Sequence, residues 1–218
     1  MKNTIEIING GKSFRKNEVF SNVNIKIKKG SAVGVVGHNG SGKSVLFKVI
    51  CGFIPLTYGE VFVDGKKLGE EIDIPRNVGI IIETPGFLPY LTGFQNLHQL
   101  ATIRGVIGKE RIKEVMGLVG LDAESTIKVS GYSLGMRQRL AIAQAIMEKP
   151  DILILDEPFN GLDKEGLTSI RNLILDIKRK GVTILLASHH PLDIELICDE
   201  IYRFEGGKLE FINSINEY

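Results

Sequence analysis

The chain has 218 residues, 43% of them hydrophobic, which is enough apolar material for the core of one domain and excludes a disordered protein. Lys and Arg number 27 and Asp and Glu number 26, so the formal net charge is +1. This near-balance argues against nucleic acid as the main partner, and we expect none.

Secretion and membrane insertion are also disfavoured. The two cysteines, Cys51 and Cys198, have neither metal-site nor disulfide-framework spacing, which favours a reducing, intracellular setting. The N-terminal stretch MKNTIEIING has polar residues too early for a signal peptide. No apolar run reaches the roughly 18–20 residues that a membrane-spanning helix needs, so any membrane role requires a partner.

The N-terminal part of the chain predicts antiparallel strands. Apolar and polar residues alternate over residues 23–28, as in a half-buried strand. Residues 61–63 form an apolar run that leads into Asp64–Gly65, a hairpin turn signal. A second hairpin is predicted at the end of the chain, over residues 201–212, with its turn at Gly206–Gly207.

Four continuous apolar runs predict strands that are covered on both faces, as in a parallel sheet. These runs are residues 32–36, 79–82, 152–155 and 183–186. Helical spacing of apolar residues follows the first run, over residues 45–50, and the third run, over residues 167–177. Gly181 is expected to end the later helix as its C-cap.

Between the second and third runs, residues 86–149 predict a mostly helical insertion. Apolar residues recur there at helical spacing, at Ile112, Val115, Met116, Val119, Leu140, Ala143 and Met147. We therefore expect an α/β fold with a core mixed sheet, an antiparallel β subdomain and an inserted helical lobe. Residues 1–218 would form one domain, with residues 1–85 and 150–218 as the catalytic core and β subdomain and residues 86–149 as the helical subdomain.

The segment GHNGSGKS matches G-x-x-x-x-G-K-[ST] in full, between a predicted strand and a predicted helix. Its glycines let the backbone wrap around an anion, and the helix adds its positive N-terminal end. Lys43 would reach the β- and γ-phosphates of ATP, and Ser44 would bind Mg²⁺. The alternative, a glycine-rich turn with a chance lysine, is disfavoured by the flanking elements. The predicted nucleotide-binding residues here are Gly37, His38, Asn39, Gly40, Ser41, Gly42, Lys43, Ser44 and Val45, with the His38 side chain expected to face outward.

Two acidic residues follow the predicted strand at residues 152–155. Asp156 and Glu157 come at its carboxyl end, where parallel sheets bind ligands. Asp156 would hold Mg²⁺, and Glu157 would be the general base or would position the attacking water. The alternative is an ordinary acidic strand end, but the upstream phosphate loop favours a functional pair.

A histidine ends the next predicted strand. His189 could reach the γ-phosphate from there and help to position water, whereas a lone histidine is more often structural or solvated. His190 is the rival for this role.

Together these motifs resemble the ATP-binding subunits of ABC transporters over essentially the whole chain. Residues 37–44 resemble Walker A, and residues 152–157 resemble Walker B. SLGMRQRL resembles the signature motif, NGLD with Asp163 resembles the D-loop, and Ser188–His189 resembles the switch histidine. Phe14 matches the aromatic residue that stacks on adenine, although a core role is the alternative. The resemblance implies a P-loop NTPase fold of the ABC ATPase type.

The signature stretch comprises Ser133, Leu134, Gly135 and Met136. Ser133 is a good N-cap residue, and the helix N-terminus with Gly135 would make a second anion site, whereas a plain helix start is the alternative. Nothing suggests that one chain folds this site onto its own P-loop. The resemblance implies a head-to-tail dimer, expected to be a homodimer, in which each signature caps the partner's γ-phosphate. Leu134 and Met136 depart from the usual Gly and Gln.

One further departure concerns Glu83, where the family usually has a glutamine that touches Mg²⁺. The phrase IIETPGFLPYLTGFQNL, like YSLGMRQRL, resembles the bacitracin- and lantibiotic-resistance branch, which also carries Glu there. The alternative is drift in an ordinary ABC-2-type exporter subunit. The predicted metal ligands are Ser44, Glu83 and Asp156.

The resemblance implies an ATP-binding and ATP-hydrolysing subunit that powers a separate membrane permease, with export of a peptide antibiotic or a similar amphiphile as the specific expectation. Such a subunit would be cytoplasmic and peripheral, held at the inner membrane face by the permease. One alternative is a non-transport ABC ATPase, but those usually carry coiled-coil insertions, zinc modules or two cassettes. Another is a regulatory nucleotide-binding module, which the intact Lys43, Asp156, Glu157 and His189 disfavour.

Overall fold

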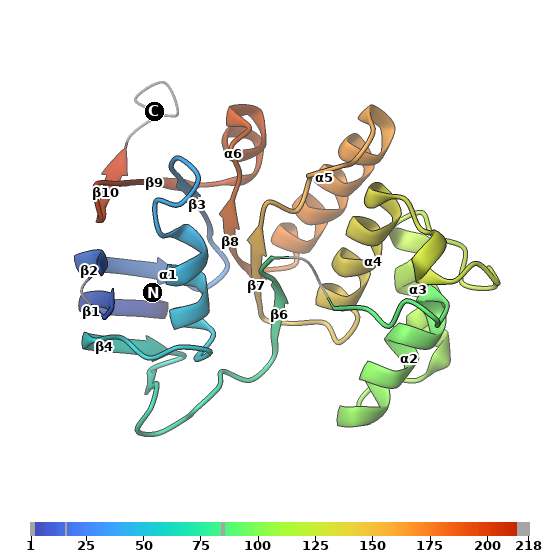
Figure 1. Cartoon of the computed structure of the whole chain (residues 1–218), viewed down its shortest axis with the longest axis horizontal. Coiled ribbons are helices and arrows are strands. Elements are labelled where there is room, and N and C mark those ends of the chain that lie inside the picture. Colours follow the sequence, from blue (N-terminus) through green and yellow to red (C-terminus); the bar gives the residue numbers. More distant parts are fainter. Residues whose placement is uncertain (1–2, 16, 84–85, 213–218) are drawn as a thin grey trace.

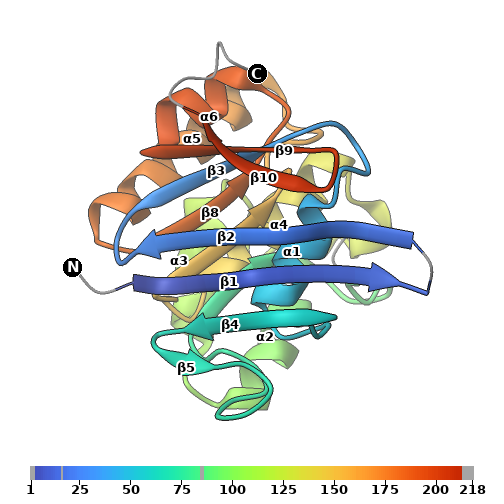
Figure 2. The same cartoon turned by 90° about the vertical axis from the view of Figure 1, so that its left-hand side faces the viewer.

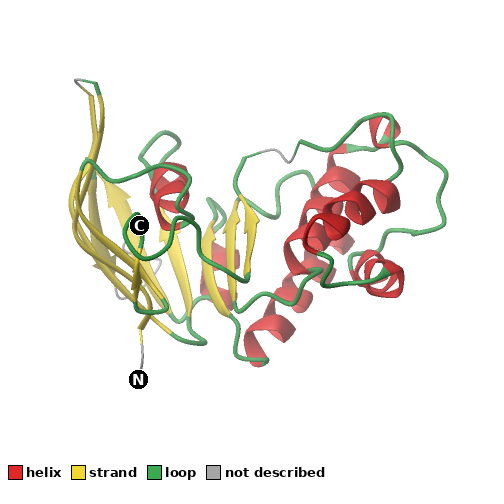
Figure 3. Cartoon of the chain, turned by 90° about the horizontal axis from the view of Figure 1, so that it is seen from below, coloured by secondary structure: helices red, strands yellow, loops and turns green. Residues whose placement is uncertain are grey.

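A computed structural model describes residues 3–15, 17–83 and 86–212. Figure 1 shows a layered molecule, with an antiparallel sheet on one side, a mixed sheet in the middle and helices on the other side. Seen from below in Figure 3, one helix lies between the two sheets and the remaining helices gather beyond the second sheet. The predicted α/β architecture is therefore confirmed.

The antiparallel sheet has the strand order β2-β1-β4-β5 and faces the viewer in Figure 2. Its predicted hairpin is confirmed, because Val63 pairs with Lys66 around a turn in which Asp64 and Gly65 have φ of 52° and 79°. Positive φ at both turn residues suits the twist of a tight hairpin. The strands are β1 (Asn3–Phe14), β2 (Asn17–Lys28), β4 (Tyr58–Val63) and β5 (Lys66–Lys67).

The mixed sheet has the order β10-β9-β3-β8-β7-β6. The four strands predicted from continuous apolar runs lie next to one another at one side of this sheet and are parallel, as expected. The C-terminal hairpin is also confirmed, and its first strand extends the parallel sheet by pairing with β3. The strands are β3 (Ala32–Val36), β6 (Val78–Ile81), β7 (Ile152–Asp156), β8 (Thr183–Ala187), β9 (Glu200–Glu205) and β10 (Lys208–Ile212).

Helix α1 (Lys43–Ile50) fills the space between the two sheets. Leu46, Phe47 and Ile50 are at most 1% exposed and pack in one cluster with residues of both sheets, including Ile7 and Val35. A helix buried on several sides cannot shift without opening this core, so the loop that leads into α1 is held in place.

The helical segment contains α2 (Gly93–Arg104), α3 (Lys109–Leu118), a 3₁₀ turn (Val129–Gly131) and α4 (Leu134–Ile146). It shares one hydrophobic cluster with the second face of the mixed sheet. The two are in close contact at Gly79, where a Cβ atom would lie 2.0 Å from the Ala145 carbonyl oxygen. The predicted boundary after residue 85 touches residues 84–85, which lie outside the described residues, so the division into subdomains stays a prediction.

Two helices follow β7 and β8. Helix α5 (Lys164–Arg179) was predicted, and helix α6 (Pro191–Ile197) was not. Only Ile194 and Ile197 give α6 an apolar face, which is too little for a periodic signal. Within the described residues, no helix is both long and apolar enough to cross a bilayer.

Candidate functional site

The loop between β3 and α1 leaves room for an anion. Gly40 has φ of 80°, and a Cβ atom there would meet nothing within 4 Å. Gly37 is needed for the opposite reason, because a Cβ atom there would lie 2.5 Å from the Phe204 carbonyl oxygen. Gly42 is the N-cap of α1 and offers no side-chain acceptor to the first N–H groups of the helix. These N–H groups are available to a phosphate group.

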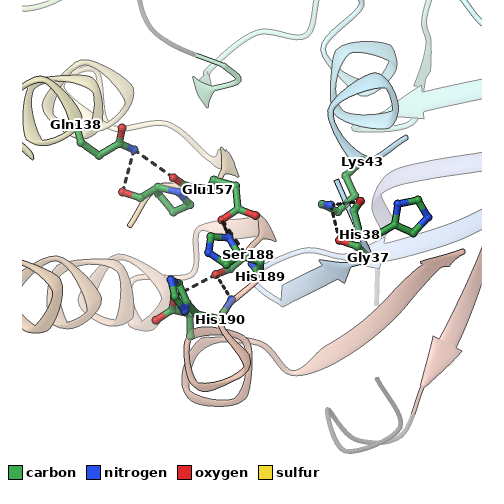
Figure 4. A network of polar contacts seen from close by, with 10 residues as sticks. Gly37, His38, Lys43, Gln138, Glu157, Ser188, His189 and His190 are labelled. Carbon is green, nitrogen blue, oxygen red and sulfur yellow. Dashed lines mark hydrogen bonds and ion pairs between the residues drawn. The ribbon is translucent and has the colours of Figure 1, made fainter. Parts of the chain in front are cut away.

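The Lys43 side chain folds back over this loop. Its Nζ atom donates to the carbonyl oxygen of Gly37 at 2.6 Å and to that of His38 at 3.0 Å, as Figure 4 shows. The residue is only 7% exposed. Burial lowers the pKa of Lys43, while the charges of Glu157 and Asp156 raise it. The His38 side chain is exposed, as expected.

Ser44 and Asp156 bring α1 and β7 together. The Ser44 hydroxyl donates to Oδ2 of Asp156 at 2.5 Å. Burial raises the pKa of Asp156, and the hydrogen bond from Ser44 and the charge of Lys43 lower it. Two hard oxygen ligands thus lie side by side next to the phosphate loop, which is the ligand type that Mg²⁺ prefers.

Glu157 sits on a constrained turn after β7. Its φ is 51°, which is unusual for a residue other than glycine, and its N–H donates to the Ala187 carbonyl oxygen at 2.9 Å. Its Oε2 atom lies 2.7 Å from Nδ1 of His189. Among the described residues, its buried Oε1 atom has no hydrogen-bond partner. The carboxylate is therefore oriented by a histidine and keeps one oxygen free.

The structure distinguishes the two histidines. His189 bonds to Glu157, whereas the His190 backbone N–H donates to the Ser188 hydroxyl at 3.1 Å. Ser188 in turn donates to the fully buried Asp193 on α6 at 3.1 Å, and Asp193 pairs with Arg171 on α5. This buried network, partly visible in Figure 4, anchors the backbone beside His189.

Glu83 borders the same region but has a partner that was not predicted. Its Oε1 atom lies 2.5 Å from Nζ of Lys48, and its side chain is 65% exposed. The negative charge of Glu83 raises the pKa of Asp156, so the two carboxylates are electrostatically coupled. Lys48 follows Ser44 by one helical turn on α1, so the sequence could place the two side chains on one helix face but carried no signal for the pairing with Glu83.

Phe14, at the end of β1, is 48% exposed and is not a core side chain. The Nζ atom of Lys12 lies 4.8 Å from its ring centroid, as in a cation–π contact. Phe14 lines the same cavity as the phosphate loop. An aromatic face is therefore presented to whatever occupies the cavity.

These groups surround one cavity of about 690 Å³, called here the P-loop cavity. Its wall includes Phe14, Lys43, Val45, Glu83, Asp156 and Glu157. The first turns of α4 form the facing wall through Leu134, Arg137 and Gln138. Gln138 was not among the predicted site residues, although it lies within SLGMRQRL, the stretch that resembles the signature motif.

The rest of the signature stretch lines a second cavity, also of about 690 Å³, called here the signature cavity. Ser133 caps α4, accepting a hydrogen bond from the Met136 N–H at 3.2 Å. Asp163 caps α5 and pairs with Arg139 at 3.3 Å. Leu134 differs from the other predicted signature residues, because it lines the P-loop cavity.

The residues present fit Mg²⁺ and a nucleoside triphosphate. Ser41 Oγ and Glu157 Oε1 are buried without partners among the described residues, so a ligand can satisfy them. The space over Gly40, the uncapped N-terminus of α1 and the Lys43 ammonium suit phosphate oxygens. Ser44 and Asp156 provide oxygen ligands for the cation.

Known proteins resemble this chain in sequence and in fold. The ABC transporter family profile matches residues 20–160. An uncharacterized ABC transporter ATP-binding protein, YybJ of Bacillus subtilis, is 41% identical over 206 residues, covering 94% of each chain. The bacitracin transport ATP-binding protein BcrA of Enterococcus faecalis is 40% identical over 216 residues, covering 98% of this chain and 70% of BcrA.

A solved structure agrees with the fold. The dimeric, post-hydrolysis ATP-binding cassette MJ0796, bound to ADP and Pi, superposes with a TM-score of 0.83 at 25% identity, covering 94% of this chain and 96% of that one. The predicted ABC ATPase fold, ATP and Mg²⁺ as ligands and the likeness to the bacitracin branch are confirmed. The chain belongs to the ABC transporter family, as an ATP-binding subunit that hydrolyses ATP.

Proposed function

We propose that this chain drives a separate membrane permease that exports a peptide antibiotic or a similar amphiphile, and that it works as a dimer held at the inner membrane face by that permease. The observation that carries the proposal is the convergence of Lys43, Ser44, Asp156 and Glu157 on one cavity. The relative BcrA is a bacitracin transport ATP-binding protein, which supports the choice of cargo.

Binding of ATP would use the groups that line the P-loop cavity. The backbone amides of residues 37–44 and the Lys43 ammonium would hold the triphosphate, exchanging the two carbonyl contacts of Lys43 for phosphate oxygens. The Phe14 ring would stack on adenine, and Val45 and Asn39 would line the nucleotide. Ser44 and Asp156, with Glu83 nearby, would hold Mg²⁺, which neutralises charge on the phosphates when bound.

Hydrolysis would use the carboxylate that remains free. Oε1 of Glu157 would accept a hydrogen bond from the attacking water and take its proton as the water adds to the γ-phosphorus. The bond between that phosphorus and the β,γ-bridging oxygen would break, and ADP would leave with the bonding electron pair. His189 would hold the other oxygen of Glu157, which fixes the direction of the free one. The strained backbone at Glu157 supports the same role, since such strain gathers at functional sites.

A second copy would complete the site. Ser133, Gly135 and Met136 line a cavity distinct from the P-loop cavity of the same chain, with Asp163 beside them. The helix N-terminus there suits a phosphate group from another molecule. The dimeric state of the structural neighbour supports this pairing.

The test is the substitution Glu157→Gln, which keeps the shape of the side chain and removes its basicity. We expect ATP binding to persist, turnover to fall roughly 10²–10⁴-fold, and an ATP-bound dimer to accumulate in size-exclusion chromatography. Glu110→Gln, on the exposed start of α3, is the matched control and should hydrolyse ATP normally. Near-normal turnover in Glu157→Gln would remove Glu157 from the mechanism.

The transport part has its own test. Co-purification of the tagged chain from membranes should yield an integral membrane protein, and deletion of the gene should sensitise cells to a peptide antibiotic that the permease exports. Recovery with DNA or ribosomes instead of a membrane protein would contradict the transport role.

A further inference from the structure

Gln138 joins the helical segment to the turn that carries Glu157. It lies on the second turn of α4. Its Nε2 atom donates to the Pro158 carbonyl oxygen at 2.9 Å and, more weakly, to the Glu157 carbonyl oxygen at 3.4 Å. Figure 4 shows the side chain reaching from the helix to this turn. An amide is suited to this contact, because its NH₂ group can donate to two carbonyl oxygens.

The backbone of Glu157 is thereby held from two sides. On the sheet side, its N–H donates to the Ala187 carbonyl oxygen at 2.9 Å. On the helix side, its carbonyl oxygen accepts from Gln138, and within the turn itself it accepts from the Asn160 N–H at 3.3 Å. The left-handed φ of 51° is unfavourable for glutamate, so the turn depends on such neighbours to keep its shape.

The same end of α4 borders the signature cavity. Ser133 caps the helix there, and Gly135 is packed so closely that a Cβ atom on it would lie 2.8 Å from the Gly161 carbonyl oxygen. The first turns of α4 and residues 157–161 are therefore in contact at two points. A shift of the helix N-terminus cannot leave the Glu157 turn unchanged.

We propose that Gln138 is a positioning residue that couples the signature cavity to Glu157 of the same chain. A nucleotide that is held by a second copy and contacts Ser133 orders the start of α4. Through the hydrogen bonds of Gln138, this ordering fixes the turn that carries the Glu157 carboxylate. Each nucleotide thus promotes hydrolysis of the other, so turnover is cooperative. This inference rests on the proposed dimeric function.

The test compares two substitutions at Gln138 in the full chain. Gln138→Met keeps the length but cannot donate, and Gln138→Glu is isosteric but places an acceptor against two carbonyl oxygens. We expect kcat to fall about 2- to 10-fold in Gln138→Met and further in Gln138→Glu. The KM for ATP and the melting temperature should change little, and the Hill coefficient for ATP should drop toward one. The matched control is Gln144→Met, on the same helix beside smaller pockets.

The outcomes separate this inference from the function on which it rests. If Glu157→Gln does not dimerise with ATP, the dimeric function fails, and the coupling fails with it. If Glu157→Gln dimerises while Gln138→Met keeps the parent kcat and Hill coefficient, the coupling alone is wrong. A loss of melting temperature or of ATP binding in both variants that matches their loss of turnover would also overturn it, because Gln138 would then be only structural.

Discussion

The P-loop cavity and the signature cavity have the same volume, about 690 Å³, but their polar side chains are held in different ways. In the first, Lys43, Ser44 and Asp156 already bond to one another or to the loop backbone. In the second, Ser133 uses its side chain on its own helix, and Asp163 is paired with Arg139.

This difference indicates where each cavity finds its ligand. The elements that line the P-loop cavity are buried in one core. A single chain can therefore hold the Lys43 ammonium, the carboxylates and the phosphate-binding loop in place before the nucleotide binds. The signature cavity has a helix N-terminus but, within the described residues that line it, no lysine. It can assist a phosphate that another molecule holds, and we expect it to contribute mainly in a dimer.

The largest effect is expected for the P-loop cavity. Lys43→Ala removes the buried ammonium, and Mg·ATP affinity should fall on the order of 100-fold or more, since truncating one partner of a desolvated charge pair is costly. Titration with a fluorescent ATP analogue measures this loss. Lys29→Ala, at an exposed position, should bind like the parent protein. Unchanged affinity in Lys43→Ala would mean that the nucleotide does not use this loop.

A smaller effect is expected at Ser133, on turnover and not on ATP binding by the monomer. Ser133→Asp keeps a good N-cap residue but puts a negative charge where a partner's phosphate would lie. ATP binding to the monomer should stay within about twofold, whereas turnover should fall about 10- to 100-fold, because like charges at an interface cost several kcal/mol.

The dimer provides the direct readout for this change. In the Glu157→Gln background, Ser133→Asp should abolish the ATP-bound dimer seen in chromatography. Thr92→Asp, at the N-cap of α2, makes the same type of change at a helix start elsewhere and should leave the dimer intact. A dimer that survives Ser133→Asp would show that the signature cavity does not receive the partner's nucleotide.

The smallest effect is expected at the rim of the P-loop cavity. Glu83→Gln removes a carboxylate that is coupled to Asp156, so ATP binding should persist while the Mg²⁺ concentration for half-maximal ATPase activity rises about two- to tenfold. Lys48→Gln added to Glu83→Gln should move the Mg²⁺ requirement part of the way back, because Lys48 loses its partner in the single variant and its positive charge also acts on Asp156. A magnesium titration that is identical for all these variants and the parent would exclude Glu83 from the metal site.

The phosphate loop and the parallel strands around it could be predicted from short stretches of the sequence. The phosphate loop has its own glycine spacing, and the four parallel strands are continuous apolar runs, so both were recognisable without knowledge of distant contacts. Helix α6 was missed because its short apolar face carries no periodic signal. Gln138 and the Arg171–Asp193 pair were missed because their roles depend on partners about 20 residues away or more, which no local spacing encodes.

The sequence by itself determined the chemistry that is available: a cradle for phosphate, oxygen ligands for a cation and a carboxylate at the end of a buried strand. Only the tertiary structure decided which groups work together, since hydrogen bonds of 2.5–3.0 Å are set by how helices and strands pack. Packing brings His189 rather than His190 into contact with Glu157, and it pairs Glu83 with Lys48. It also places Leu134 in the wall of the P-loop cavity, whereas the rest of the signature stretch lines the signature cavity.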